Sequence, residues 1–414
     1  MREMKDSGID IVGEIPKGWK LERLRYLCDI TTGNQDTQDA DPDGEYDFYV
    51  RSPKIEKSTK YSFDGEGILM AGDGAGAGRI FHHAYGKYAV HQRVYIINNI
   101  REIDSSFLFY YISNVFPKLM DKGSAQSTVP SVRLPMLLNF TLALPDKKKQ
   151  NLISSYLDTQ CSEIDATAED IQKEISLLED YKKSVITEAV TKGLNPDAEM
   201  KDSGIEWIGE IPKDWVTIRI GNVFSLRNER NYLPMEQVQL LSLYSGKGVF
   251  PTGEEGTTNS GNHAQTVADY KIVKKNDIVV NIILAWMGSL GISNYNGVVS
   301  PAYDVYIPNE EKVVPHYYHY VFRTSGIANE CYRYGRGIMM MRWRTYSSEF
   351  KRIHVPFPPL EEQQQIADYL DSKCSEIDTL IADKKRQLDI LADYKKSLIY
   401  EYVTGKKEVL VKDF

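Results

Sequence analysis

Two stretches of this chain, residues 79–93 and 333–352, interleave basic and aromatic side chains. These residue types suit the reading of DNA, because arginine can donate two hydrogen bonds to guanine and glutamine can pair similarly with adenine. Further cations would neutralise phosphates and set the register on the duplex. The candidate contacts are Arg79, His91, Gln92 and Arg93 in the first stretch, Arg333, Arg336, Arg342 and Arg344 in the second, and Lys247 as a weaker candidate between them.

The charge balance permits this interpretation without requiring it. Solvated strand faces have a similar composition, so a structural role stays open, more for the first stretch than for the second. The net charge of -8 argues against non-specific coating of DNA. Charge is uneven, however: residues 216–359 carry 15 Lys and Arg against 11 Asp and Glu, and residues 20–146 carry 14 against 16. An acidic total still allows local basic faces.

Catalytic motifs are missing or incomplete. Residues 63–67 formally match the F-x-G-x-G of methyltransferases that use S-adenosylmethionine, but no N-P-P-Y or D-P-P-Y accompanies them, and Asp64-Gly65 is more simply a turn. A P-loop G-x-x-x-x-G-K-[ST] and a G-x-S-x-G are also missing. Four scattered cysteines and seven histidines show no metal-ligand spacing. We expect neither enzyme activity nor a cofactor or metal in this chain.

The segments that flank the two stretches occur twice, in the same order. Residues 4–19 return as 200–215 (12 of 16 identical), 156–165 as 369–378 (8 of 10) and 180–191 as 393–404 (9 of 12). The first pair is offset by 196 residues and the other two by 213, so the second intervening block is 17 residues longer. Similar flanks around dissimilar blocks indicate a pseudo-twofold internal repeat.

Residues 147–192 and 361–404 contain neither Gly nor Pro, and their apolar residues recur at alternating steps of four and three. This spacing is typical of a coiled coil. Two amphipathic helices packed onto separate domains are the alternative. The predicted seam consists of Leu157, Ile164, Ile171, Ile175 and Leu178 in the first helix and of Leu370, Ile377, Ile381, Leu388 and Leu391 in the second.

Connectivity predicts that the two helices are antiparallel. Each has roughly 45 residues and would be ~65 Å long at ~1.5 Å per residue. The second domain begins where the first helix ends, so the second helix must return, and Cys161 and Cys374 would face opposite ends and could not bond. The expected organisation is domain one at 1–146, the first helix at 147–194, domain two at 195–359, the second helix at 360–407 and a tail at 408–414.

Both intervening blocks are predicted to mix strands and helices. Each has a buried strand, a glycine turn, further strands and an aromatic-rich helix; the expected strands are 68–70, 94–97, 278–280 and 305–307, the glycine turns 72–78 and 288–291, and the helices 107–115 and 316–322. The predicted fold class is α+β, with two α/β domains separated by an antiparallel two-helix coiled-coil spacer.

The repeated segments resemble a known family. The motif K-D-S-G-[ILV]-[DE]-W-[IL]-G-E-I-P-x-x-W stands almost complete at Lys201–Trp215, and at Lys5–Trp19 with Ile11 in place of Trp. Leu144-Pro145 and Pro358–Gln363 match the lead-ins to the helices, although the first copy has Lys147–Gln150 where Glu-Gln is usual. Over nearly its whole length the chain resembles the specificity subunit of type I restriction-modification systems.

The resemblance implies two target-recognition domains on an antiparallel helical spacer. Each would read one half of an asymmetric, split site in double-stranded DNA, and the helices would dock two methyltransferase subunits, with restriction subunits added through the complex. S-adenosylmethionine, ATP and magnesium would belong to those partners. Base-contacting residues do not carry over, so the candidates above rest on chemistry alone.

Two other functions stay open. One is a non-enzymatic adaptor whose coiled coil joins two protein-binding domains, and the other is a methyltransferase with fused specificity, against which the missing N-P-P-Y weighs. The most apolar window, Ile278–Ile292, is too short and too interrupted to span a bilayer, and we expect a cytoplasmic protein.

Overall fold

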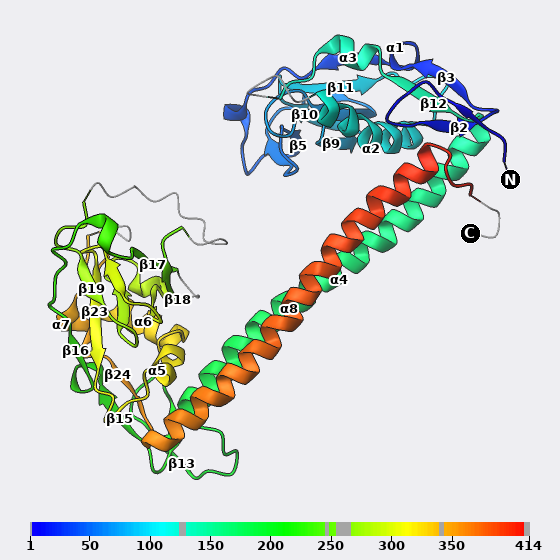
Figure 1. Cartoon of the computed structure of the whole chain (residues 1–414). Helices are drawn as coiled ribbons and strands as arrows, with labels where there is room; N and C mark the ends of the chain where they lie inside the picture. Colours follow the sequence, from blue (N-terminus) through cyan, green and yellow to red (C-terminus); the bar gives the residue numbers. More distant parts are fainter. Residues whose placement is uncertain (1, 124–129, 245–247, 254–265, 339–342, 410–414) are drawn as a thin grey trace. The chain divides into compact units, whose positions relative to one another are not determined.

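The computed structural model describes residues 2–123, 130–244, 248–253, 266–338 and 343–409. The chain divides into two compact units, Met1–Gln172 with Lys385–Phe414 and Lys173–Lys384. Each unit contains one α/β domain and a part of both long helices, α4 (Lys147–Lys192) and α8 (Leu360–Val403) (Figure 1). Within the described residues, none of the helices is both long and apolar enough to cross a membrane.

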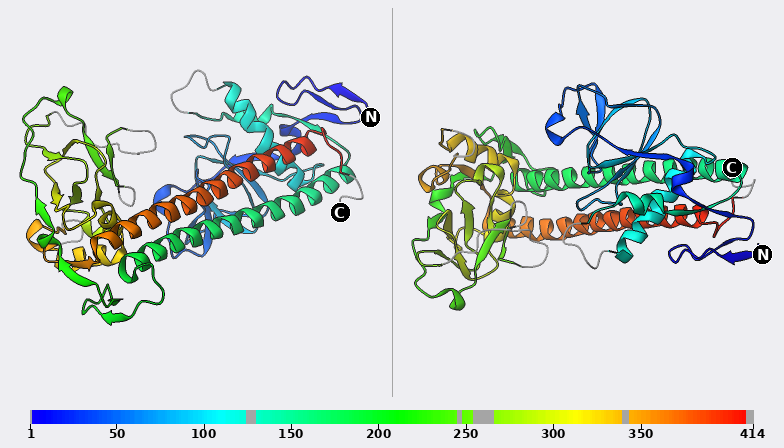
Figure 2. Two further views of the ribbon diagram at one scale, coloured as in Figure 1. Left: turned by 60° about the horizontal axis from the view of Figure 1, so that its bottom comes forward. Right: turned by 90° about the horizontal axis from the view of Figure 1, so that it is seen from above.

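The two long helices pair in opposite directions within each unit (Figure 2). In the first unit, the ring of Tyr156 packs against that of Tyr402 with centroids 4.8 Å apart, and Lys395 Nζ lies 2.6 Å from Asp165 Oδ1. In the second unit, Lys384 Nζ lies 2.5 Å from Glu174 Oε2 and Lys182 Nζ 2.6 Å from Asp378 Oδ2. Residues later in α4 meet residues earlier in α8, which confirms the antiparallel prediction.

The predicted seam faces inward along both helices. Leu178, Leu388 and Leu391 are half-buried, and the other seven seam residues are buried: Leu157, Ile164, Ile171, Ile175, Leu370, Ile377 and Ile381. The alternative of helices packed onto domains also holds at the helix ends, because Leu157 and Leu398 belong to the core of the first unit and Val190 and Leu370 to that of the second. All four cysteines are buried and free.

Replacing Ile175 with Lys should lower the free energy of unfolding by about 3 kcal/mol, because the substitution places a charge in the seam. Ile175 is 2% exposed. Chemical denaturation of the full chain measures the change. Ser176→Lys adds the same charge at the exposed neighbouring position and should change the stability by less than about 0.5 kcal/mol. Equal losses in both variants would contradict the burial of Ile175 against α8.

The two α/β domains share one topology. Each has a sheet of four antiparallel strands, β4-β11-β8-β9 in the first and β16-β23-β20-β21 in the second. The bounds are β4 Asp29–Thr32, β8 Gly67–Ala71, β9 Phe81–Ala84, β11 Val94–Asn98, β16 Phe224–Leu226, β20 Ile278–Asn281, β21 Leu290–Ile292 and β23 Tyr303–Pro308. The strands predicted at 68–70, 94–97, 278–280 and 305–307 lie within these elements, although Gly291 belongs to β21 and not to the preceding turn.

A second group of strands repeats as well. In the first domain the order is β6-β5-β10-β7, with β5 and β10 parallel. In the second, the hairpin β17-β18 and the antiparallel pair β19-β22 are joined by a parallel bridge between Leu240 and Val298. The bounds are β5 Tyr46–Tyr49, β6 Glu56–Ser58, β7 Phe63–Asp64, β10 Lys87–Val90, β17 Leu241–Tyr244, β18 Gly248–Pro251, β19 Lys271–Val273 and β22 Gly297–Val299. The dissimilar blocks therefore fold alike.

Helices and a closing strand pair connect each domain to the long helices. The helices are α1 Leu24–Leu27, α2 Ser105–Gly123, α3 Leu134–Leu138, α5 Pro315–Val321, α6 Ser325–Tyr334 and α7 Ser347–Phe350, with short 3-10 turns η1 Thr37–Asp39, η3 Ile220–Asn222, η4 Met235–Gln237 and η5 Ala285–Met287. The closing pairs are β3 Lys20–Arg23 with β12 Thr141–Leu144, and β15 Val216–Arg219 with β24 His354–Phe357.

The repeated lead segments form hairpins, β1 (Met4–Asp6) with β2 (Glu14–Pro16) and β13 (Met200–Asp202) with β14 (Glu210–Pro212). Each ends in a buried tryptophan near a glycine with positive φ: Trp19 lies against Gly405, after α8, and Trp215 against Gly193, after α4. A Cβ on Gly405, where φ is +71°, would stand 2.6 Å from Pro16 and 3.0 Å from Trp19, so only glycine permits this approach. The repeated motif therefore encodes the joint between a hairpin and a helix end.

The departures of the first copy from the motif have structural counterparts. Trp207 packs on α6, where a Cβ on Gly326 would meet its ring at 2.1 Å, whereas Ile11 in the first copy packs against the core of the first unit. Trp215 Nε1 donates to Glu362 Oε2 at 2.7 Å. The residue of the first copy that corresponds to Glu362 is Lys149, whose side chain has no acceptor for such a hydrogen bond.

Candidate nucleic-acid interface

Three loops of the first domain meet at one edge. The turn of residues 91–93 joins β10 to β11, the His91 N–H donates to the Tyr49 carbonyl at the end of β5 (3.0 Å), and the Gly72 N–H after β8 donates to the Arg93 carbonyl (2.8 Å). These backbone hydrogen bonds hold the β5–β6, β8–β9 and β10–β11 loops together. We call this the loop edge of the first domain.

A carboxylate lies between two arginines on this loop edge. Asp73 Oδ1 lies 2.8 Å from Arg51 Nη1, and Asp73 Oδ2 lies 3.7 Å from Arg93 Nη1. Both arginine side chains remain largely exposed, so the pairing orients the guanidinium groups and leaves donors facing solvent. Neighbouring Gln92 is exposed, and its Nε2 donates to Asp36 Oδ2 at 2.9 Å. Sequence reasoning missed Arg51, because it lies far from the basic stretch along the chain.

His91 is placed differently from its prediction. It is 3% exposed, its Nδ1 accepts the Arg93 N–H at 3.0 Å, and its Nε2 lies 3.4 Å from Thr37 Oγ1 and 3.5 Å from Asp36 Oδ1. Burial, together with the positive charge of Arg51, lowers the pKa of His91, so the ring is neutral at pH 7. The structure therefore makes His91 a support beneath the 91–93 turn, and we withdraw it as a DNA contact.

Arg79 lies in the β8–β9 loop and pairs with α2. Its Nη2 lies 2.6 Å from Asp121 Oδ1, and the side chain keeps about a third of its surface exposed. The ion pair links the loop to the helix, which favours a structural role, while the exposed part of the guanidinium could still reach a phosphate.

In the second domain the basic stretch is built around a stacked aromatic pair. Arg336 and Arg344 exchange two backbone hydrogen bonds of 2.9 Å. Trp343 stacks on Tyr332 with ring centroids 5.1 Å apart, and its Nε1 donates to the Tyr332 carbonyl at 3.0 Å. A Cβ on Gly335 would lie 2.3 Å from that Nε1, so glycine is required for the approach. This packing fixes the backbone positions from which the flanking arginine side chains extend.

The described arginines of this stretch have exposed side chains, and two of them pair with a glutamate. Arg336 Nη2 lies 2.9 Å from Glu349 Oε1 and Arg333 Nη1 lies 3.4 Å from Glu330 Oε1, and both glutamates are buried. Arg344 is exposed. Arg342 and Lys247 lie outside the described residues and stay predictions. The described part of this surface can offer three guanidinium groups to an acceptor.

The two basic surfaces occupy corresponding places in the shared topology. In the first domain the Val132 N–H, two residues before α3, donates to the carbonyl of Gly72, the residue after β8 (2.8 Å). In the second, the Thr345 N–H, two residues before α7, donates to the carbonyl of Ile282, the residue after β20 (2.8 Å). Arg344, next to Thr345, therefore lies beside the loop that follows β20, at the edge that corresponds to the loop edge of the first domain. We call it the loop edge of the second domain. Arg93 and Arg344, chosen by chemistry in two dissimilar blocks, thus fall on corresponding edges of one fold.

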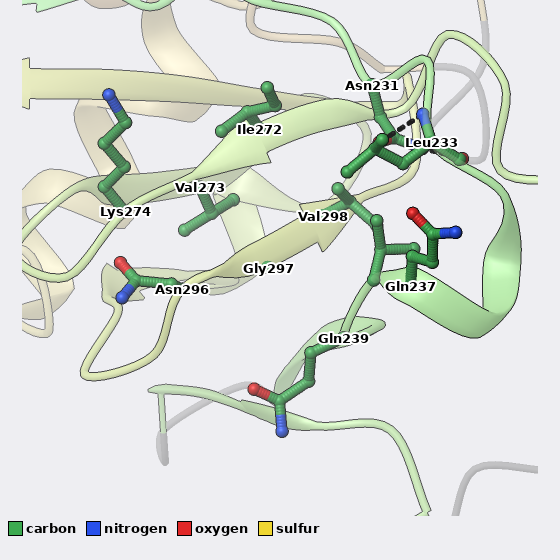
Figure 3. A pocket seen from close by; sticks show the side chains of 11 residues that line it. Asn231, Leu233, Gln237, Gln239, Ile272, Val273, Lys274, Asn296, Gly297 and Val298 are labelled. Atoms are coloured by element: carbon green, nitrogen blue, oxygen red, sulfur yellow. Dashed lines mark hydrogen bonds between the residues drawn. The ribbon is translucent and has the colours of Figure 1, made fainter.

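A cleft of about 500 Å³ lies elsewhere on the second domain (Figure 3). It runs over β19 and β22 and is lined by apolar side chains together with the amides of Gln237, Gln239 and Asn296. Buried Asn231 lies at one end of the cleft. Its side-chain amide already has protein partners, because Nδ2 donates to the carbonyls of Leu233 (2.9 Å) and Val267 (3.0 Å). The cleft does not include the arginines of the loop edge. Across the described ranges, no group of three or more His, Cys, Asp or Glu could hold a metal ion.

Comparison with known proteins gives a family match over most of the chain. The model of the type I restriction modification DNA specificity domain matches residues 16–177 and again residues 212–389. The two matches coincide with the two repeats deduced from the sequence.

Individual relatives agree with the family model. The chain is 21% identical over 415 residues to the type I restriction enzyme EcoDI specificity subunit of Escherichia coli, with 95% of this chain and 90% of the relative covered. It is 25% identical over 441 residues to the putative MjaX specificity subunit of Methanocaldococcus jannaschii, with 96% of each covered. A solved chain, from a structure described as the basis of complex assembly and conformational transition of the type I R-M system, superposes with a TM-score of 0.64 at 14% identity, covering 95% of this chain and 99% of that one.

Proposed function

The chain belongs to the type I restriction modification DNA specificity family, and from this premise we propose that each of its two recognition domains reads one half of an asymmetric, bipartite DNA site. The domains are the α/β domains described above, and each would read DNA through its loop edge. The observation that carries this proposal is the corresponding position of the basic surfaces in two domains of unlike sequence. Unlike side chains on equivalent edges would read unlike bases.

The geometry suggests how each edge would work. Arg93 and Arg51 flank Asp73, which holds their guanidinium planes before DNA arrives and so reduces the conformational entropy lost on binding. Gln92 stands beside them and could pair with adenine. In the second domain, Glu330 and Glu349 orient Arg333 and Arg336 in the same manner. Arginines that reach base edges would specify sequence, and the others would fix the register on phosphates.

The long helices would act as the spacer between the half-sites. α4 has 46 residues and α8 has 44. A paired, continuous helical rod resists bending, so its length would set the distance between the bases read, about one DNA turn between half-site centres. The antiparallel pairing within each unit supports this role, because both helices would have to change length together.

Duplicated apolar side chains on the helices offer docking sites for partners. Leu177 and Tyr181 on α4 are 69% and 50% exposed, and their repeat counterparts on α8, Ile390 and Tyr394, are 60% and 51% exposed. Leu177 and Tyr181 also line a groove of about 420 Å³ with Leu380. Exposed apolar residues repeated in two places fit two copies of one partner. We assign these docking pairs to two methyltransferase subunits, which would bring S-adenosylmethionine, while restriction subunits would bring ATP and magnesium.

Methylome sequencing of cells with and without this gene tests the proposed function. The expected result is one bipartite, asymmetric motif that is methylated only when the gene is present together with its methyltransferase partner. A methylome that does not depend on the gene would contradict the proposal and favour the adaptor.

Arg344→Ala should weaken specific binding by about 1–3 kcal/mol and relax sequence preference in one half-site only, because a lost base contact affects the base it reads. Arg93→Ala is the matched variant and should affect the other half-site. Competition binding on oligonucleotides substituted in each half measures both. If either variant weakened binding equally on every sequence, its arginine would be a phosphate contact and not a reader.

A further inference from the structure

The fourth residue of each long helix is a buried glutamine that bonds to the recognition domain. Gln150 is 3% exposed: its Oε1 accepts the Asp104 N–H at 2.8 Å and its Nε2 donates to the Pro145 carbonyl at 2.9 Å. Gln363 is fully buried: its Oε1 accepts the Val314 N–H at 2.8 Å, and its Nε2 donates to the Pro358 carbonyl at 2.9 Å and to that of Lys312 at 3.3 Å. Asp104 and Val314 directly precede α2 and α5, so each glutamine anchors the start of a domain helix.

A second contact joins the same helices further along. Tyr110 of α2 donates to Asp158 Oδ1 of α4 at 2.7 Å, and Tyr320 of α5 donates to Asp371 Oδ1 of α8 at 2.5 Å. Asp158 and Asp371 are the aspartates of the repeated Tyr-Leu-Asp sequence. Burial first, and then the neighbouring aspartate, raise the pKa of both tyrosines well above the ordinary value, so both remain donors at any physiological pH.

The two contacts have the same spacing in both units. On the long helix, glutamine and aspartate are eight residues apart in each copy, and on the domain helix the two partners are six residues apart in each copy. One contact alone would be a pivot about which the domain could swing. Two contacts separated by about 12 Å along a helix fix a direction as well as a point. The recognition domains differ in sequence, yet both retain this two-point attachment.

We propose that Gln150 with Asp158, and Gln363 with Asp371, are positioning residues that set the angle at which each recognition domain is held on the helical spacer. This inference rests on the proposed function. A loop edge reads its half-site only where the duplex presents it at a matching distance and angle. Because the attachment fixes this angle, a helical spacer of given length favours one number of base pairs between the half-sites.

The second attachment has an added partner. His316 Nε2 lies 2.7 Å from Asp371 Oδ1, the oxygen that also accepts from Tyr320. The corresponding residue of α2, four before Tyr110, is Ser106. Substituting Asp371 would disturb both contacts, whereas substituting a tyrosine removes only one hydrogen bond. Tyrosine variants are therefore the cleaner probes.

The test measures methylation by the assembled complex of this chain with its methyltransferase subunits. The substrates are duplexes that carry the native half-sites with the native spacer, or with one base pair more or fewer. The quantity of interest is the spacer ratio, which is the rate on the native spacer divided by the rate on the altered ones. Tyr110→Phe, Tyr320→Phe and the double variant lose the donor. Asp158→Leu and Asp371→Leu lose the acceptor, and Asp158→Asn and Asp371→Asn retain one.

The double tyrosine variant loses two hydrogen bonds and should lower the spacer ratio about tenfold, a factor that corresponds to ~1.4 kcal/mol. Base preference within each half-site and the melting temperature should stay near the wild-type values. Asp158→Leu should behave like Tyr110→Phe, and Asp371→Leu should lower the ratio at least as far as Tyr320→Phe, because it also removes the His316 contact. The asparagine variants should restore most of the ratio. A merely structural role would lower the rates on all spacers together.

An unchanged spacer ratio in the double tyrosine variant would overturn the inference, as would an equal loss on every spacer or a failure of the asparagine variants to restore the ratio. Tyr110→Phe alone keeps the test available if the double variant is unstable, with a smaller fall in the ratio expected. If the wild-type complex methylates no bipartite site, the proposed function itself is wrong, and this inference falls with it. If the wild type prefers one spacer and the variants keep that preference, only this inference is wrong.

Discussion

Inserting one heptad into each long helix should move the preferred spacer by about three base pairs and leave the bases unchanged. Seven helical residues add ~10 Å, and base pairs are stacked ~3.4 Å apart. The insertions belong at the same level of both helices, after Gln172 and after Lys384, beside the ion pair of Lys384 with Glu174. Each inserted heptad should continue the seam, so that the antiparallel pairing is retained. Methylation rates on duplexes with graded spacers measure the shift.

A control separates length from sequence. Replacing seven native residues at the same places by the heptads used for insertion changes the seam chemistry without changing the length. This variant should keep the native spacer. If the lengthened chain methylated duplexes with the native spacer as fast as the wild type does, the length of the helices would not set the spacer.

Replacing both docking pairs with glutamate should abolish methyltransferase binding. Leu177→Glu with Tyr181→Glu removes one pair, and Ile390→Glu with Tyr394→Glu removes the other. Loss of two partly exposed anchors should weaken each site by at least about a hundredfold, because burying a carboxylate against an apolar partner costs several kcal/mol. Native mass spectrometry should show two bound methyltransferases for the wild type, one for each single-pair variant and none for the combined variant.

The matched control places the same charge elsewhere on the same helices. Thr159 and Ser372 are repeat counterparts, and both are exposed. Thr159→Glu with Ser372→Glu should leave two methyltransferases bound. Because all the substituted side chains face solvent, the variants should keep the wild-type melting temperature. Two methyltransferases on the combined variant would show that the docking pairs are not the docking site.

Most of the architecture followed from periodicity and repetition. Seam residues such as Leu157 and Ile377 were predictable, because helical spacing alone determines which face they share. The antiparallel pairing followed from connectivity, since the second domain begins where α4 ends. Lys182, Lys384 and Lys395 make ion pairs across the helices, a detail that depends on the register between them.

The site was less accessible to sequence reasoning. Composition proposed Arg93, Arg336 and Arg344, but it could not distinguish exposed residues from buried ones, so it also proposed His91, which is buried. Arg51 was missed because its partner Asp73 lies on another loop, and only the fold brings β5 and β8 to one edge. The two-point attachments were invisible for the same reason, since Tyr110 and Tyr320 lie in blocks that do not align by sequence.

The account depends on each recognition domain reading its own half-site, and one chimera tests this directly. Residues 20–144 are replaced by a second copy of residues 216–357, so that the new segment begins and ends with the closing strand pair β15 and β24. The measurement is the methylome of cells that express this chimera with the methyltransferase partner. The account predicts that the methylated motif becomes an inverted repeat of the second half-site with the native spacer. Continued methylation of the original asymmetric motif would contradict it.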